Sequence, residues 1–186
     1  MNYRKRPRRL LPLLMGISLL LCLAGTGTYA FLTDTQSLPN IFTVGKVGIR
    51  LAETTGDTYP LVPGLDIVKD PAVTVKAGSE ACWLFVRLQE ENHLSTYARY
   101  RTAPGWEKLE ENVYYRRVDR QDTDQHFQVL EGNKLTVPDT VTQAMLDKLQ
   151  EASFPRLTVH ASACQYYASD GIPFTPHQAW QTLQEG

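Results

Sequence analysis

Four histidines are the residues of this 186-residue chain best suited to metal binding or proton transfer: His93, His126, His160 and His177. A zinc hydrolase usually carries two ligands on one helical face with a carboxylate beside them, as in the HExxH spacing. None of the histidines lies in that pattern, and no two of them are three to five residues apart. The sequence therefore predicts no metal site.

The patterns of serine and carboxylate catalysis are also missing. No GxSxG motif occurs, so no serine is placed on a nucleophile elbow. Glu90-Glu91 and Glu110-Glu111 are adjacent pairs, and adjacent residues of a strand point to opposite faces. We interpret these carboxylates as solvated turn charges. Because there is no glycine-rich phosphate loop either, the sequence predicts neither an enzyme nor a cofactor.

Two tyrosine pairs, Tyr114-Tyr115 and Tyr166-Tyr167, have side chains of the kind that stack on sugar rings. Aromatic residues in sheets are more often cross-strand packing partners. We therefore expect these tyrosines to pack within the protein. A surface adhesin or carbohydrate-binding role for them stays open as an alternative.

Short extended segments must position these residues. Alternation of apolar and polar residues indicates strands, and runs with strand character occupy 41–52, 72–76, 81–88, 113–118, 126–130, 134–137 and 157–167. The run 81–88 begins apolar on both faces, which predicts a central strand. Gly132-Asn133 between two runs indicates a hairpin. Many short strands with glycine and proline turns predict an all-β sandwich.

Two short helical insertions complete the expected fold. The first opens at Pro138-Asp139, with Asp139 or Thr140 as its cap, and its apolar face comprises Val141, Met145, Leu146 and Leu149. The second begins after Thr175, because Pro176 suits the first helical position, and its apolar stripe comprises Ala179, Trp180 and Leu183. No repeat or linker divides the mature chain, so residues 41–186 are predicted to form one β-sandwich domain.

Residues 1–30 are predicted to be a signal peptide. A positive n-region precedes an almost wholly apolar run from Leu10 to Leu23. This run of about 14 residues is short for a spanning helix, which needs about 20. Thr28 to Ala30 has the small–x–small form of a signal peptidase site, so cleavage after Ala30 leaves Phe31 as the new N-terminus. An uncleaved membrane anchor stays open as the alternative.

Removal of residues 1–30 changes the charge of the chain. The whole sequence holds 19 basic and 20 acidic residues; five basic residues and no acidic ones leave with the signal peptide. The mature chain thus keeps 14 basic against 20 acidic residues, a net charge of −6. No basic cluster remains beyond Arg116-Arg117. Binding to nucleic acid or to an anionic membrane surface is therefore disfavoured, and a membrane is a partner only through an uncleaved signal segment.

The cysteines leave two interpretations open. Of three cysteines, Cys22 lies in the apolar core of the predicted signal peptide. Cys82 and Cys164 remain, and export permits a disulfide between them. Two buried free thiols, each packing as a small hydrophobic residue, are the alternative. Their spacing fits no metal motif.

The junction TYAFLTDTQSLPNIFTVGKVGIRL, residues 28–51, carries a pattern of its own: Tyr29, Ala30, Phe31, Asp34, Asn40, Phe42, Gly45, Val47, Ile49 and Leu51. In these residues it resembles the N-terminus of the TasA/camelysin family, whose members are exported by SipW-type signal peptidases of Gram-positive bacteria. Further similar stretches occur at 59–88, 105–117 and 157–172. The resemblance covers nearly the whole mature chain.

This resemblance implies a secreted structural protein of the extracellular matrix or cell surface, with a jelly-roll-like antiparallel β-sandwich. It further implies polymerisation into biofilm-matrix fibres, in which the N-terminal segment of one subunit adds as a strand to the next. The extended segment 31–40 would hold this donor strand, with Phe31, Leu32, Thr33, Asp34 and Leu38 as its residues. Apolar Phe31 and Leu38 would be its anchors, and Pro39 would end it. Its partners would be further copies or a related matrix protein, and the SipW-type signal peptidase.

The same resemblance carries an alternative function. Camelysins are classed as metallopeptidases, which would make this chain a cell-surface metallopeptidase, although its histidines form no zinc motif. The chain is also shorter than TasA and carries Cys82 and Cys164. An accessory role beside a main fibre subunit therefore stays open.

Overall fold

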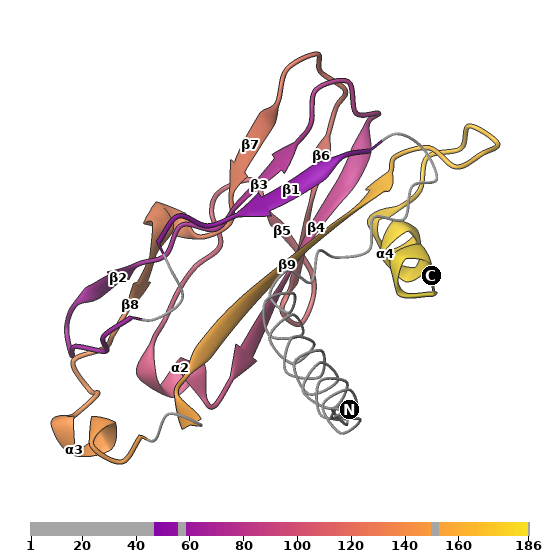
Figure 1. Ribbon diagram of the computed structural model, residues 1–186. Coiled ribbons are helices and arrows are strands. Elements are labelled where there is room, and N and C mark those ends of the chain that lie inside the picture. Colours follow the sequence, from indigo (N-terminus) through magenta and orange to yellow (C-terminus); the bar gives the residue numbers. More distant parts are fainter. Residues whose placement is uncertain (1–46, 56–58, 150–152, 186) are drawn as a thin grey trace, which may run out of the picture. The chain divides into compact units, whose positions relative to one another are not determined.

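The computed structural model describes residues 47–55, 59–149 and 153–185. The chain divides into two units, Met1–Leu38 and Pro39–Gly186, and all described residues belong to the second. They form antiparallel sheets with few helices (Figure 1), so the expected all-β class is confirmed at this level. Among the helices that the structure describes, none combines the length and apolarity that crossing a bilayer requires.

The described strands form three antiparallel sheets. The largest has the strand order β5–β6–β4–β9, with bounds Glu107–Glu110, Val113–Val118, Cys82–Glu91 and Arg156–Gln165. A three-stranded sheet has the order β1–β3–β7, with bounds Ile49–Ala52, Ala72–Val75 and Gln125–Gln128. A short ribbon pairs β2 (Asp66–Val68) with β8 (Lys134–Thr136).

Strand β4 lies inside the largest sheet because the first part of the strand, Cys82 to Val86, is apolar on both faces. It pairs with β6 along one edge and with β9 along the other. Leu84, Val86 and Leu88 point to one face and Phe85 to the other, and all four are 0% exposed. The central strand expected at 81–88 is therefore confirmed, and it continues to Glu91.

One face of the largest sheet packs against the three-stranded sheet. Val73 and Val75 of β3 join Leu84, Val86 and Leu88 of β4 in a single buried cluster. Full burial of a large aliphatic side chain contributes about 1.5–3 kcal/mol. This cluster is therefore a main source of the free energy that holds the two sheets together.

Helix α4 (Pro176–Glu185) covers the other face of the largest sheet. Ala179 and Trp180 are buried there, and the Trp180 ring lies 5.2 Å from that of Phe85, centroid to centroid. The helix begins with a reciprocal cap, in which Gln178 N–H donates to Thr175 Oγ1 (3.3 Å) and Thr175 N–H donates to Gln178 Oε1 (2.9 Å). The helix expected after Thr175 is confirmed.

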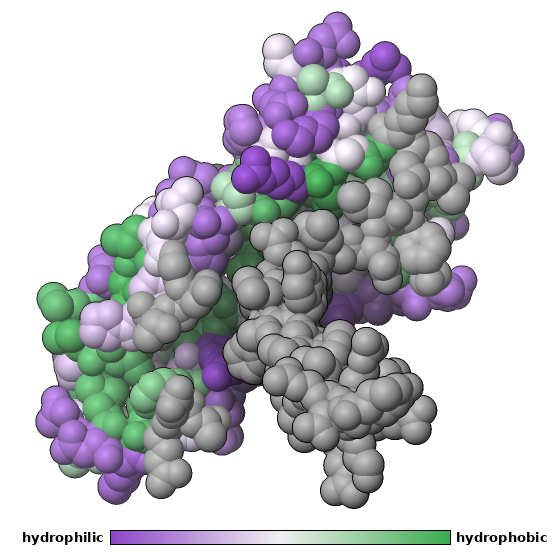
Figure 2. Space-filling model, viewed as in Figure 1, coloured by the Kyte–Doolittle hydropathy of each residue, from purple (hydrophilic) through white to green (hydrophobic). Residues whose placement is uncertain are grey.

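A third apolar cluster lies beside the β2–β8 ribbon, next to α2 (Leu94–Tyr97) and α3 (Gln143–Leu146). Its buried members are Ile67, Leu94, Ala98, Leu135, Val137 and Val141. Outside this cluster, Val62, Leu65 and Val68 stay exposed. Apolar surface is visible over this part of the molecule in Figure 2.

Several expectations about single elements are wrong. Gly132-Asn133 does not close a hairpin, because β7 pairs with β3 whereas β8 pairs with β2; both residues instead have positive φ in the short 3-10 turn Glu131–Asn133. The first predicted helix begins at Gln143 instead of Asp139. Strands β2 and β5 are further elements that no clear alternation in the sequence indicates.

We expect Phe85→Ala to destabilise the protein by about 3–5 kcal/mol, because it leaves a cavity between the largest sheet and α4. The matched control is Val68→Ala, at a position that is 61% exposed, where a change within about 0.5 kcal/mol is expected. Urea unfolding followed by tryptophan fluorescence measures both. Equal effects of the two substitutions would contradict the assignment of Phe85 to the core.

Candidate functional site

The predicted signal cleavage site and donor strand lie outside the described residues, which begin at Val47. These residues are Thr28, Ala30, Phe31, Leu32, Thr33, Asp34 and Leu38. Their roles stay predictions. What the structure does describe is the surface onto which an added strand could pair.

Strands β1 and β9 are edge strands of two different sheets. In the part of the chain that the structure describes, β1 pairs only with β3 and β9 only with β4. Each therefore has an outer side with backbone N–H and C=O groups that no described strand satisfies. The two strands lie close to each other (Figure 1), and we call the strip between them the β1–β9 seam.

Apolar side chains from both strands turn into this seam. Ile49 and Leu51 of β1 are only half-buried, although they pack against the main core cluster. Leu157 and Val159 of β9 are half-buried against the same cluster. His160 points the other way and is exposed. Within the described ranges, the β1–β9 seam thus combines unpaired strand edges with partly exposed apolar side chains, which are the two features that strand addition uses.

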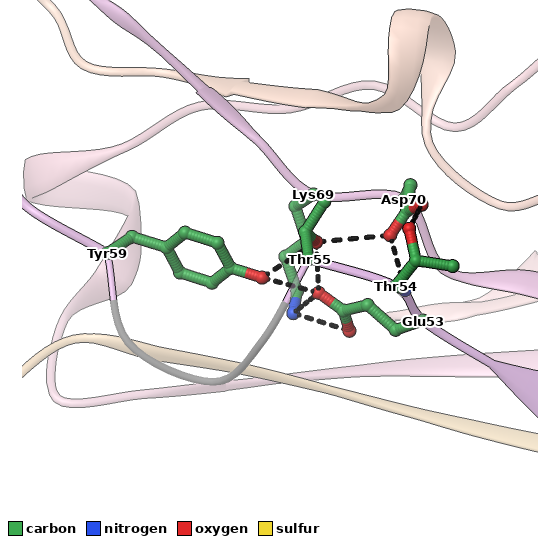
Figure 3. A network of polar contacts seen from close by, with 6 residues as sticks. All are labelled: Glu53, Thr54, Thr55, Tyr59, Lys69 and Asp70. Carbon is green, nitrogen blue, oxygen red and sulfur yellow. Dashed lines mark hydrogen bonds and ion pairs between the residues drawn. The ribbon is translucent and has the colours of Figure 1, made fainter.

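A polar network follows the end of β1 (Figure 3). The Lys69 side chain is 9% exposed, and its Nζ lies 2.8 Å and 2.9 Å from the two carboxylate oxygens of Glu53. Tyr59 donates its hydroxyl hydrogen to Glu53 Oε1 (2.7 Å), and the Lys69 ammonium lies 5.5 Å from the Tyr59 ring centroid. A buried ammonium requires such a partner, because an unpaired charge is costly to desolvate.

Asp70 forms the second half of the network. It accepts hydrogen bonds from the hydroxyl and the backbone N–H of Thr54, and from the Thr55 hydroxyl (3.1 Å). The side-chain hydrogen bond from Thr54, followed by the backbone one, lowers the pKa of the Asp70 carboxyl below its ordinary value. The network ties the residues after β1 to those after β2. We interpret it as a structural clamp that holds the end of β1 in place.

Cys82 and Cys164 are both buried free thiols in the structure. Cys82 pairs with Gln165, and Trp83 pairs with Cys164, so the two cysteine side chains leave the sheet on opposite faces. Of the two alternatives, the structure contains the free thiols, and a disulfide would need the backbone to move. Burial raises the pKa of Cys82 to about 12, and it also raises the pKa of Cys164.

The histidines stay apart from one another. His126 Nδ1 lies 2.8 Å from the Thr74 hydroxyl across the β3–β7 pair, whereas His160 and His177 are exposed on β9 and α4. Among the residues that the structure describes, no group of three or more His, Cys, Asp or Glu side chains is arranged to hold a metal ion.

Tyr115 and Tyr166 pack around Trp83 on the α4 side of the largest sheet, whereas Tyr114 packs against the main core cluster on the opposite face and Tyr167 is 50% exposed. The Trp83 ring lies 5.5 Å from Tyr115 and 5.4 Å from Tyr166, and Arg117 lies 4.2 Å from the Tyr166 centroid. Because ring faces and edges are used in these contacts, the arrangement favours packing over sugar stacking. Glu110, expected to be a solvated turn charge, accepts a hydrogen bond from the Trp180 indole at 2.8 Å.

Comparison of the chain with protein-family models, with curated proteins and with solved structures gives no match.

The two thiols are expected to react slowly with a maleimide at pH 8, because burial keeps them protonated and out of contact with the reagent. In urea, without any reductant, both should react at once. Mass spectrometry of the labelled protein measures the number of modified thiols. Rapid labelling before unfolding would contradict the burial, and failure to label in urea would reveal a disulfide.

Glu53→Gln is expected to lower the free energy of unfolding by about 1–3 kcal/mol, because it leaves the buried Lys69 ammonium without its anion. Lys69→Met should cost less, since it removes the buried charge and leaves only the more exposed Glu53 carboxylate unpaired. Urea unfolding at fixed pH compares the two variants. A larger loss of unfolding free energy in Lys69→Met than in Glu53→Gln would show that the network stabilises the fold mainly through packing of the Lys69 side chain.

Proposed function

We propose that this chain is a secreted structural protein that assembles into extracellular fibres, as a fibre subunit or an accessory, by adding its N-terminal segment as a strand to a neighbouring copy. The proposal includes a jelly-roll-like β-sandwich and export through a SipW-type signal peptidase. The observation that carries it is the β1–β9 seam. Among the described residues, the seam offers two sheet edges without a pairing strand together with half-buried apolar side chains, which are the features that an added strand uses.

The geometry of an extended strand suits this seam. At about 3.3 Å per residue, an extended segment 31–38 would span about 26 Å. It would therefore run along most of β9, which has ten residues. Residues six apart in a strand share a face, so Leu32 and Leu38 would point together toward the apolar side chains of the seam. Phe31, the other expected anchor, would point to the opposite face of the added strand. Backbone hydrogen bonds would supply affinity, and these two leucines would set the register.

The chemistry of the chain is consistent with a structural role outside the cell. The expected mature chain has a net charge of −6, which gives solubility without a basic surface for nucleic acid. Cutting after Ala30 would also free the segment that the proposal assigns to the donor strand. Processing would therefore control assembly as well as release.

Protein recovered from producing cells, with its N-terminus verified as Phe31, is expected to form filaments visible by negative-stain electron microscopy. Deletion of residues 31–38 should leave it monomeric, because the donor strand is gone. Val159→Lys should do the same by placing a charge in the seam, whereas the matched control His160→Lys on the outer face of β9 should still form filaments.

Mixing the deletion variant with Val159→Lys supplies one intact seam and one intact donor strand. This mixture should give 1:1 dimers and no filaments by analytical ultracentrifugation. Filaments from the deletion variant alone, or monomers from the correctly processed wild-type protein under all conditions, would rule out assembly by strand addition.

A further inference from the structure

Arg116 of β6 occupies an unusual position for a cation. It pairs across the sheet with Leu84, so its side chain leaves the sheet on the face that packs against the three-stranded sheet. There its guanidinium lies 4.0 Å from the Phe127 ring centroid and 5.5 Å from that of Trp106. The Trp106 indole is itself fixed by a 2.8 Å hydrogen bond to the Gln128 carbonyl. The guanidinium plate is therefore held by aromatic rings in a defined orientation.

Gly105 lies against the same guanidinium. A Cβ at this position would lie 3.1 Å from Nη2 and 3.4 Å from Nη1 of Arg116. The backbone of Gly105 also has a φ of 88°, which favours glycine over any other residue. Any side chain at this position would crowd the terminal nitrogens of Arg116, so the close approach of this backbone to the guanidinium requires glycine.

Arg116 lacks the anion that its neighbours have. Arg117 pairs with Asp119 at 3.0 Å and Arg120 with Glu80 at 2.6 Å, whereas no carboxylate contacts Arg116 among the described residues. Its Nε is buried without an acceptor in the part of the chain that the structure describes, and burial lowers the pKa of the guanidinium below its ordinary value. A half-buried cation with an unsatisfied donor is expected to bind an anion when one can reach it.

We propose that Arg116, held between Phe127, Trp106 and Gly105, is a receptor for a carboxylate group. A carboxylate matches the planar fork of a guanidinium with two parallel hydrogen bonds. A single positive charge between apolar rings suits a monoanion better than a phosphate dianion, and the neighbouring Arg117 points to the opposite face of β6. The carboxylate comes either from a soluble carboxylic acid or from an acidic side chain of a second copy.

The Arg116 site is independent of fibre assembly. None of its residues belongs to β1 or β9, and carboxylate binding can be measured on protein that forms no filaments. Its failure would leave strand addition untouched, and the failure of strand addition would leave this site untouched.

The test is an NMR titration of the processed protein, with acetate and glutarate as probes and chloride at equal ionic strength as the reference. The Arg116 Nε–Hε signal is identified by its loss in Arg116→Lys. It should shift saturably with the carboxylates and not with chloride. Because Arg116→Lys has no such signal, the affinity of this variant for the carboxylates is measured from the backbone signals that shift in the wild type. This affinity should fall roughly tenfold or more, because lysine lacks the two parallel N–H donors of the guanidinium. The matched control, Arg117→Lys, should bind as the wild type does.

Sedimentation across a range of protein concentrations separates the two sources. Dimerisation that Arg116→Gln weakens and excess acetate competes away assigns the carboxylate to a second copy. Saturable binding without such dimerisation assigns it to a soluble acid. If the wild-type signal does not shift with either probe and Arg116→Gln associates as Arg117→Gln does, the proposal is overturned, and Arg116 serves only to pack against Phe127.

Discussion

Burial of both faces of β4 is the constraint that the other elements must satisfy. Leu84, Val86 and Leu88 on one face and Phe85 on the other are fully buried, so each face needs its own cover. The three-stranded sheet supplies one cover and helix α4 the other. The cap at Thr175 and the hydrogen bond from Trp180 to Glu110 then hold the helix on its face. Elements distant in sequence are thereby joined through one strand.

The same arrangement leaves the sheet edges as the chemically open part of the molecule. β4 is protected because β6 and β9 pair with it on both sides. β1 and β9 have no such protection among the described strands, and proteins generally cover, charge or use an edge of this kind. The clamp formed by Glu53, Lys69 and Asp70 fixes the end of β1, which keeps one side of the seam at a constant place. A rigid edge is a better acceptor for a strand than a mobile one.

Most buried polar groups of the described residues have a close partner, and Arg116 Nε and Asn133 Oδ1 are the two side-chain atoms that do not. The Lys69 ammonium, the Trp83 and Trp106 indoles and the Thr74 hydroxyl each have a close partner. Such pairing offsets the cost of desolvation. The Arg116 guanidinium instead packs against aromatic rings, and no described residue accepts a hydrogen bond from its Nε.

Local patterns in the sequence were sufficient to predict several elements. An apolar run predicted β4, the run at 157–167 predicted β9, and threonine before proline predicted the start of α4. Each of these signals depends only on residues within one segment, so the packing of that segment against the others does not change the element that it predicts. The prediction of a hairpin at Gly132-Asn133 was wrong because turn residues do not determine which strands pair. The two flanking strands pair with other partners, β7 with β3 and β8 with β2.

By itself, the sequence determined the all-β class, the central strand and the last helix, because periodicity and capping act over a few residues. Only the tertiary structure decided the positions of side chains across strands. Cys82 and Cys164 lie on opposite faces because of a cross-strand register that no local pattern encodes. Arg116 and Arg117 look equivalent in the sequence, yet one meets Phe127 and the other Tyr166. The β1–β9 seam likewise exists only because two separate sheets bring their edges together.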